Sequence, residues 1–119
     1  MFLSIEDVTI FAEGLDHPEC IAVHPDGSVW AGGEAGQIYR ISQDGKDVQE
    51  INNTRGFVLG IAFSPDASWL AICDLKNHCV WKLNIALNEL TVFASGAEGI
   101  LFNIPNYPAF TKDGRLLRK

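Results

Sequence analysis

The segment IAVHPDGSVWA, residues 21–31, returns 40 residues later as a near copy, IAFSPDASWLA, residues 61–71. A third, shorter copy begins at residue 109 with the letters AFTKDG. Periods of about 40 to 50 residues, each built from short strands, are typical of β-propeller blades. The sequence therefore predicts an all-β fold made of four-stranded antiparallel propeller blades.

Each copy has the local pattern strand, tight turn, strand. The PDG triplet at 25–27 favours a turn, because proline presets φ, aspartate bonds the nearby backbone and glycine accepts a positive φ. The alternating QIYRI of 37–41 is echoed by CVWKL at 79–83, as half-buried strands require. We expect strands near residues 8–13, 20–24, 28–31, 37–42, 48–51, 60–64, 69–73, 79–84, 90–94, 107–111 and 115–118.

These strands predict a partial propeller. Blade 1 is expected at about 17–56, blade 2 at about 57–97 and the start of blade 3 at about 104–119, with 8–13 as the outer strand of a preceding blade. An open ring leaves unpaired strand edges and an apolar flank, which propellers normally avoid by closing. Two explanations stay open, that the chain is part of a longer product or that it assembles with itself.

The composition is that of a globular protein, with 47% hydrophobic and 20% charged residues and a formal net charge of −6. An acidic surface repels phosphate backbones and anionic lipid, so we expect no nucleic-acid or membrane partner. The start, MFLSIEDV, has neither the basic region nor the apolar core of a signal peptide, which predicts a cytoplasmic protein. The acidity suits cation binding and suits simple solubility equally.

Several conspicuous residues are interpreted as structural. The three cysteines are an odd number without a CxxC pair, which argues against a disulfide framework or a zinc site. Asp74 follows a strand and is expected to cap the next turn. The three histidines share no ligand spacing, and no Ser-His-Asp triad is readable, so the catalytic residues stay unknown. The tryptophans fall at strand positions expected to form the core between blades: Trp30, Trp69 and Trp81.

The repeat also points to one rim of the propeller channel. Glu19 precedes the inner strand of blade 1, and the equivalent positions in the next two blades are Leu59 and Asn106. A carboxylate and a carboxamide are hard oxygen donors of the kind that Ca²⁺ or Mg²⁺ prefers. Both are also ordinary solvated residues in turn-forming contexts, so the spacing alone leaves a metal site and a plain rim open.

The sequence resembles the gluconolactonase, regucalcin (SMP-30) and strictosidine-synthase-like six-bladed propellers, over the first half of such a protein. The resemblance rests on GLDHPECI at 14–21, on Asp74 and on IPNY at 104–107. It implies that Glu19 binds a divalent metal in the channel, Ca²⁺ foremost with Zn²⁺ or Mn²⁺ as alternatives, and that Asn106 binds metal or substrate. Tyr107 departs from the aspartate that is usual in that family, and the later ligands belong to blades outside this sequence.

Two functions follow from the resemblance and from the fold. The first is a metal-dependent lactone or ester hydrolase, or a remnant of one, in which the metal polarises a carbonyl. A single chain supplies too few of the expected ligands for this. The second is a non-catalytic propeller module that binds a small molecule or a protein at the channel face.

Self-assembly gives a further expectation. Eleven expected strands per chain become twenty-two in a dimer, close to the twenty-four of a six-bladed ring. We therefore expect a homodimer that closes the ring, with strand 8–12 of one chain completing the blade begun at 108–117 of the other.

Overall fold

The computed structural model describes residues 2–118, and its regular structure is almost entirely β. The one helical element among these described residues is a single 3₁₀ turn, η1 (Ile5–Asp7). The strands are β1 (Cys20–Val23), β2 (Val29–Gly32), β3 (Gln37–Ile41), β4 (Val48–Asn53), β5 (Val58–Phe63), β6 (Trp69–Asp74), β7 (Cys79–Asn84), β8 (Glu89–Ala94), β9 (Gly96–Ala97), β10 (Ile100–Leu101), β11 (Pro108–Phe110) and β12 (Leu116–Arg118).

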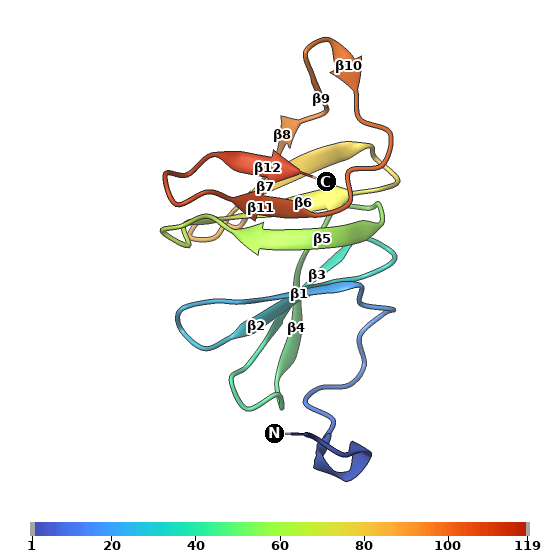
Figure 1. Cartoon of the computed structure of the whole chain (residues 1–119), viewed down its shortest axis with the longest axis vertical. Coiled ribbons are helices and arrows are strands. Elements are labelled where there is room, and N and C mark those ends of the chain that lie inside the picture. Colours follow the sequence, from blue (N-terminus) through green and yellow to red (C-terminus); the bar gives the residue numbers. More distant parts are fainter. Residues whose placement is uncertain (1, 119) are drawn as a thin grey trace.

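Two antiparallel sheets of four strands form the body of the molecule (Figure 1). The order is β1-β2-β3-β4 in the first sheet and β5-β6-β7-β8 in the second, so each sheet is a simple meander. The β11-β12 pair begins a third sheet, and β5 lies beside both β1 and β11. The predicted all-β class and the four-stranded antiparallel blades are confirmed. The short β9-β10 hairpin was not predicted.

The strand predicted at 8–13 is wrong for this structure, because these residues are extended but form no strand. A strand is defined by its ladder partner, and residues 2–118 provide none for this segment. The segment instead passes beside the turn after β3, where the Phe11 carbonyl lies so near Gly45 that a Cβ there would be 2.0 Å from it. Residue 119, the end of the predicted third blade, lies outside the described residues.

The turns after the inner strands share one hydrogen-bond pattern. In the first, the Ser28 N–H and Oγ–H donate to Asp26 Oδ1 at 2.8 and 2.5 Å. In the second, the Ser68 N–H and Oγ–H donate to Asp66 Oδ1 at 3.0 and 2.7 Å. These bonds lower the pKa of Asp66 to about 2 and that of Asp26 further, both chiefly through the serine hydroxyl. The aspartate is therefore a turn-forming residue in both copies.

The second turn is one residue longer than the first, which the sequence alignment did not show. The His24 N–H donates to the Ser28 carbonyl, whereas the Ser64 N–H donates to the carbonyl of Trp69, one position further on. From this point β6 runs one residue out of step with the aligned letters. Trp69 therefore occupies the position of Ser28, and Ala71 that of Trp30, as the pairing of Ala22 with Trp30 and of Ala62 with Ala71 requires.

Apolar side chains fill the space between successive sheets. The core between the first two sheets holds a set of side chains that are at most 6% exposed: Cys20, Trp30, Ile38, Val58, Ile61, Leu70, Ile72 and Leu83. A second cluster, which includes Ala71, Val80 and Phe102, lies under the β11-β12 pair. At about 25 cal/mol per Å² of apolar surface, such burial is the main favourable term in folding. The tryptophans predicted as core between blades contribute to these clusters, Trp30 as a buried member and Trp69 and Trp81 as partly buried neighbours.

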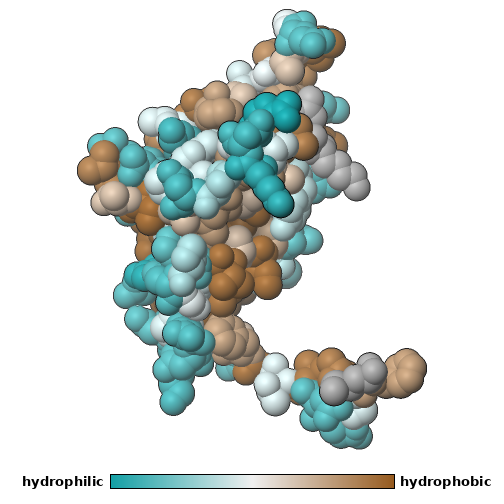
Figure 2. All heavy atoms as spheres, turned by 60° about the vertical axis from the view of Figure 1, so that its left-hand side comes forward, coloured by the Kyte–Doolittle hydropathy of each residue, from teal (hydrophilic) through white to brown (hydrophobic). Residues whose placement is uncertain are grey.

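The N-terminal arm, residues 2–11, extends away from this body with its apolar side chains in solvent. It is the projection at the lower right of Figure 2, where apolar surface lies open beside hydrophilic surface. Val8 is 63% and Ile10 77% exposed. Nothing within residues 2–118 is a helix long and apolar enough to cross a membrane.

The longer turn makes a stability prediction, because the residue with a left-handed backbone is alanine there and glycine in the first turn. Ala67 has φ +57° and Gly27 has φ +89°. A left-handed conformation costs an alanine roughly 1–2 kcal/mol, while the extra freedom of an unfolded glycine costs about 0.4–1. We expect Ala67→Gly to raise the free energy of unfolding by about 0.5–1 kcal/mol, measured by urea denaturation. Ala35→Gly, at an exposed alanine without a positive φ, is the matched control and should destabilise; the same sign for both variants would contradict this account.

Candidate functional site

The chain enters β1, β5 and β11 from the same side of the molecule, the right-hand side in Figure 1. We call this side the channel end. Glu19 lies directly before β1, and Asn106 lies two residues before β11. Both side chains are exposed, and within residues 2–118 no protein group hydrogen-bonds to either. Their oxygens are therefore available to a ligand.

The third predicted rim position differs from the other two. Leu59 lies inside β5, which begins one residue earlier, at Val58. Next to it, Gly60 lets the chain before β11 approach closely, since a Cβ there would lie 2.4 Å from the Asn106 carbonyl oxygen. A glycine is needed at this contact, which holds the Asn106 backbone against β5.

A compact group of ligating side chains lies at the channel end of blade 1. His17 Nδ1 is 3.2 Å from Asp16 Oδ1 and 3.0 Å from Glu34 Oε2. One donor atom from each of the three residues lies within 4.8 Å of the others. We call these three residues the acid–histidine cluster. Imidazole and carboxylate together are a donor set that Zn²⁺ and Mn²⁺ accept.

Neighbouring groups hold the cluster in place. Gln37 Nε2 donates to Asp16 Oδ2 at 3.1 Å, the Asp16 N–H donates to Tyr39 Oη at 3.1 Å, and the Glu34 N–H donates to the Asp16 carbonyl. The bond from Gln37, then that from His17, lowers the pKa of Asp16. The bond to Asp16, then the charge of Glu34, raises the pKa of His17, and the nearby charge of Glu19 adds to the rise.

Sequence reasoning missed this cluster because it sought ligand spacing along the chain. Asp16 and His17 precede β1, and Glu34 follows β2, which is the antiparallel partner of β1. The pairing of Cys20 with Gly32 brings the two loops together. The predicted hairpin of strands 20–24 and 28–31 could have indicated the cluster, because the residues before the first strand and after the second must lie side by side.

Asp74 is a structural residue, as predicted. It is fully buried, and its carboxylate accepts four hydrogen bonds: Oδ1 from the N–H groups of Phe57 and Asn77, and Oδ2 from Asn77 Nδ2 and Trp81 Nε1. Burial opposes ionisation here, but the bonds from Asn77, Phe57 and Trp81 outweigh it and lower the pKa. Each carboxylate oxygen of Asp74 already accepts two hydrogen bonds inside the fold, so this side chain has no acceptor site left for a ligand.

The cysteines have no place in a site either. All three are buried, and burial raises the pKa of Cys20 and of Cys79 to about 11. A thiol with so high a pKa is neither a ready nucleophile nor a metal ligand at neutral pH. The prediction that they are structural is in keeping with this environment.

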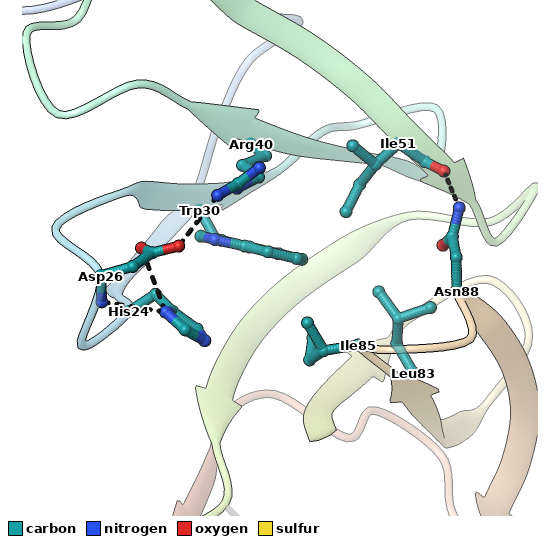
Figure 3. Close-up of a pocket in the computed structure, with 8 residues that line it drawn as sticks. All are labelled: His24, Asp26, Trp30, Arg40, Ile51, Leu83, Ile85 and Asn88. Atoms are coloured by element: carbon teal, nitrogen blue, oxygen red, sulfur yellow. Dashed lines mark hydrogen bonds and ion pairs between the residues drawn. The ribbon is translucent and has the colours of Figure 1, made fainter. Parts of the chain in front are cut away.

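A separate pocket of about 310 Å³ opens between blades 1 and 2, at the end opposite the channel end (Figure 3). We call it the interblade pocket. One wall is the ion pair in which Arg40 Nη2 donates to Asp26 Oδ2 at 2.8 Å. The floor is apolar, and the whole lining is His24, Asp26, Trp30, Arg40, Ile51, Leu83, Ile85 and Asn88. No contiguous motif in the sequence indicates this pocket, because its residues come from two different blades.

Residues 6–41 match the family model described as "Strictosidine synthase-like, N-terminal". The chain is also 33% identical over 99 residues to the Tricorn protease homolog 1 of Streptomyces coelicolor, a match that covers 82% of this chain. The WD repeat-containing protein 1 of Bos taurus is 41% identical over 81 residues, and its Xenopus laevis counterpart 1-B is 35% identical over 83.

The chain is built of β-propeller blades. The meander sheets, the repeat and the matches to propeller-type proteins all support this assignment. The match to the strictosidine synthase-like model covers β1 to β3 of blade 1 and includes Glu19. This propeller chain spans between 9% and 14% of the length of the curated relatives named above. Their whole-protein activities therefore do not transfer to it directly.

The saturated carboxylate of Asp74 makes a clear stability prediction. Asp74→Asn places an amide N–H₂ against two donors, and we expect it to lower the free energy of unfolding by about 2–4 kcal/mol. Because the pKa of Asp74 is lowered in the fold, its contribution is present above the unfolded pKa of about 3.9 and is lost as pH falls through the folded value. Wild type should therefore lose more stability between neutral pH and pH 3 than the variant does. Urea denaturation across this range tests the difference, with exposed Asp47→Asn as control; an equal loss in both proteins would contradict it.

Proposed function

We propose that the channel end of this propeller binds a divalent cation and, through it, a small oxygen-rich ligand. The observation that supports this best is the set of ligating side chains at the entrance to the inner strands. Glu19 and Asn106 are exposed and uncommitted, and the acid–histidine cluster lies beside Glu19. The fold employs the other well-placed carboxylate, Asp74, in its own hydrogen bonds, so these side chains are the ones left for function.

The donor chemistry fits two kinds of cation. Glu19 and Asn106 supply the oxygen ligands that Ca²⁺ prefers, although Ca²⁺ takes six to eight of them. The acid–histidine cluster supplies one imidazole nitrogen and two carboxylates, which suits Zn²⁺ or Mn²⁺. Its N···O separations of 3.0 and 3.2 Å are close to the roughly 3.3 Å edge of a tetrahedron with bonds of about 2.0 Å.

A metal-dependent lactone or ester hydrolase is the finer form of this proposal. Its support is the strictosidine synthase-like match over residues 6–41, which contains Glu19. A bound cation would polarise the substrate carbonyl, and the residues of this chain would hold the cation and orient the carbonyl beside it. The rival is a binding module without chemistry. The blades themselves support it, because a propeller fold hosts many unrelated functions and does not by itself require chemistry.

The test is a thermal-shift titration with Ca²⁺, Zn²⁺ and Mn²⁺. A cation that binds only the folded state at one hundred times its Kd adds about 2.7 kcal/mol, which raises the Tm by roughly 10 °C. Glu19→Gln should abolish the Ca²⁺ shift, and His17→Ala should abolish the Zn²⁺ shift while sparing that of Ca²⁺. Glu89→Gln, an exposed carboxylate on β8, is the matched control.

The outcomes separate the alternatives. If no cation raises the Tm, the metal proposal is contradicted and the binding module without a metal is left. If Ca²⁺ raises the Tm but a pH-stat assay detects no hydrolysis of a panel of aldonolactones, the hydrolase is contradicted and cation binding is not. Equal loss of the shift in Glu89→Gln would mean that binding is non-specific.

We also propose that two copies of the chain associate through the N-terminal arm. Its support is the exposed arm with Val8 at 63% and Ile10 at 77%, together with β12, which has no neighbour beyond β11 among residues 2–118. Such unpaired edges favour strand addition. The arm of one copy would pair along the open edge of the other, as in a strand swap.

Light scattering tests this association. We expect a dimer at micromolar concentration, and Ile10→Asp should weaken it by one to two orders of magnitude, because a buried charge in an apolar seam is costly. Leu87→Asp, which changes another exposed aliphatic residue at the turn before β8, is the control. A folded monomer of the wild-type chain would overturn the proposal.

A further inference from the structure

The interblade pocket lies apart from the channel end and is not a generic gap between blades. The repeat allows a direct comparison of the wall that each blade presents to the next. Position 40 of blade 1 corresponds to position 82 of blade 2, since Tyr39 faces Glu50 as Trp81 faces Val92. In the second wall, Lys82 Nζ lies 4.9 Å from the centre of the Trp69 ring, which covers this surface.

The one-residue turn insertion explains the difference. Trp69 stands where blade 1 has Ser28, so the indole of blade 2 lies nearer the turn, with Phe93 5.1 Å and Phe110 5.0 Å away. In blade 1 the indole is Trp30, deeper in the gap, where it packs edge-on against Phe63 at 5.4 Å. The space near the turn is thus left open, and Arg40 turns to Asp26 instead of lying over a ring.

The pocket combines an apolar floor with unused hydrogen-bond donors. Ile51, Leu83 and Ile85 are apolar side chains that pack against the core between the blades. His24 Nδ1 lies 3.1 Å from the Asp26 backbone nitrogen and 3.0 Å from Asp26 Oδ1, so Asp26 engages this ring nitrogen. When Nδ1 accepts from the Asp26 N–H, the ring proton is on Nε2, the nitrogen left for a ligand. The Arg40 guanidinium makes one hydrogen bond within residues 2–118, which leaves four of its five N–H groups unused.

The acceptors around the pocket are already occupied. Asp26 Oδ1 takes both donors of Ser28, and Oδ2 takes Arg40. The Asn88 amide also has partners at both ends: Nδ2 donates to the Ile51 carbonyl at 2.8 Å, and Oδ1 accepts from Asn52 Nδ2 at 2.9 Å. The lining therefore offers donors but few open acceptors. A ligand that accepts hydrogen bonds and has an apolar body matches it.

We propose that the interblade pocket binds a small carboxylate with a flat apolar body, whose carboxylate meets Arg40 and His24 while the body lies over Trp30 and the aliphatic floor. Guanidinium pairs with carboxylate in bidentate geometry more readily than with any neutral group. The volume of about 310 Å³ is at the small end of ligand pockets, which limits the occupant to a compact molecule. This proposal is independent of cation binding at the channel end.

The experiment is an ¹H–¹⁵N NMR titration of the whole chain with three probes of one shape: phenylacetate, 2-phenylethanol and phenethylamine. The three indole N–H signals are internal reporters, because Trp30 lines the pocket and Trp69 and Trp81 do not. We expect phenylacetate to shift the Trp30 signal saturably, with a Kd of about 1 mM or lower. Arg40→Gln should raise the Kd of phenylacetate by about tenfold, which corresponds to the loss of one charged hydrogen bond. The Kd of 2-phenylethanol should stay within about twofold of its wild-type value. Lys82→Gln, at the equivalent position of the next blade, is the matched control and should change neither.

Other outcomes overturn the proposal in distinct ways. If no probe shifts the Trp30 signal saturably up to roughly 10 mM, the pocket is not a ligand site. Equal affinity for the alcohol and the carboxylate would remove the role of Arg40, and tightest binding of the amine would mean that Asp26 sets the preference. Ile85→Trp, which fills the floor, should abolish binding; if a folded Ile85→Trp protein binds phenylacetate as wild type does, the ligand is bound elsewhere.

Discussion

The close face-to-face packing of the first two sheets is the contact on which the rest of the structure depends. Gly32 at the end of β2 lies so near Val58 that a Cβ there would be 2.2 Å from Val58 Cγ1. This approach joins the end of β2 to the start of β5, the next inner strand, and the buried side chains between the sheets then exclude water along their length. Because the blades are held at this spacing, the loops that enter the inner strands gather at one end of the molecule.

The division of polar residues between structure and function follows from that arrangement. A turn must satisfy the backbone N–H groups that no strand partner reaches, and Asp26, Asp66 and Asp74 do this with their carboxylates. The carboxylates with lowered pKa are therefore mostly turn-formers, and a lowered pKa by itself says little about function here. Glu19, which is exposed and has no hydrogen-bonded partner in the described chain, is more informative for that reason.

The sequence was sufficient for the strands and insufficient for their exact alignment. The repeat and the alternation of residues in 37–41 and 79–83 predicted the strands of both full blades, because a half-buried strand requires that period. Residues 8–13 were also expected to form a strand, but residues 2–118 hold no ladder partner for them, which local sequence does not reveal. The extra residue in the turn before β6 was invisible because the letters align without a gap. The hydrogen bond from the Ser64 N–H to the Trp69 carbonyl and the pairing of Ala62 with Ala71 reveal it.

The candidate sites were harder to predict for a related reason. Glu19 and Asn106 could be found because the repeat itself places them at equivalent positions. The acid–histidine cluster needs the pairing of β1 with β2, and the interblade pocket needs two blades to be packed together. Sites formed between repeats carry no contiguous motif, so their residues look like ordinary surface positions in the sequence.

The differences between equivalent positions are where a repeat protein can acquire function. Selection for folding requires each blade to cover the face of the next, and blade 2 does so with Trp69, Phe93 and Lys82. Blade 1 meets the same requirement with Trp30 placed deeper, which leaves the rim open without exposing the core. Either arrangement satisfies the packing requirement. The fold therefore does not require Arg40 at this position, where blade 2 has Lys82 over the Trp69 ring. Where folding does not dictate the residue type, selection for ligand binding can dictate it, and the pocket beside Arg40 is such a place.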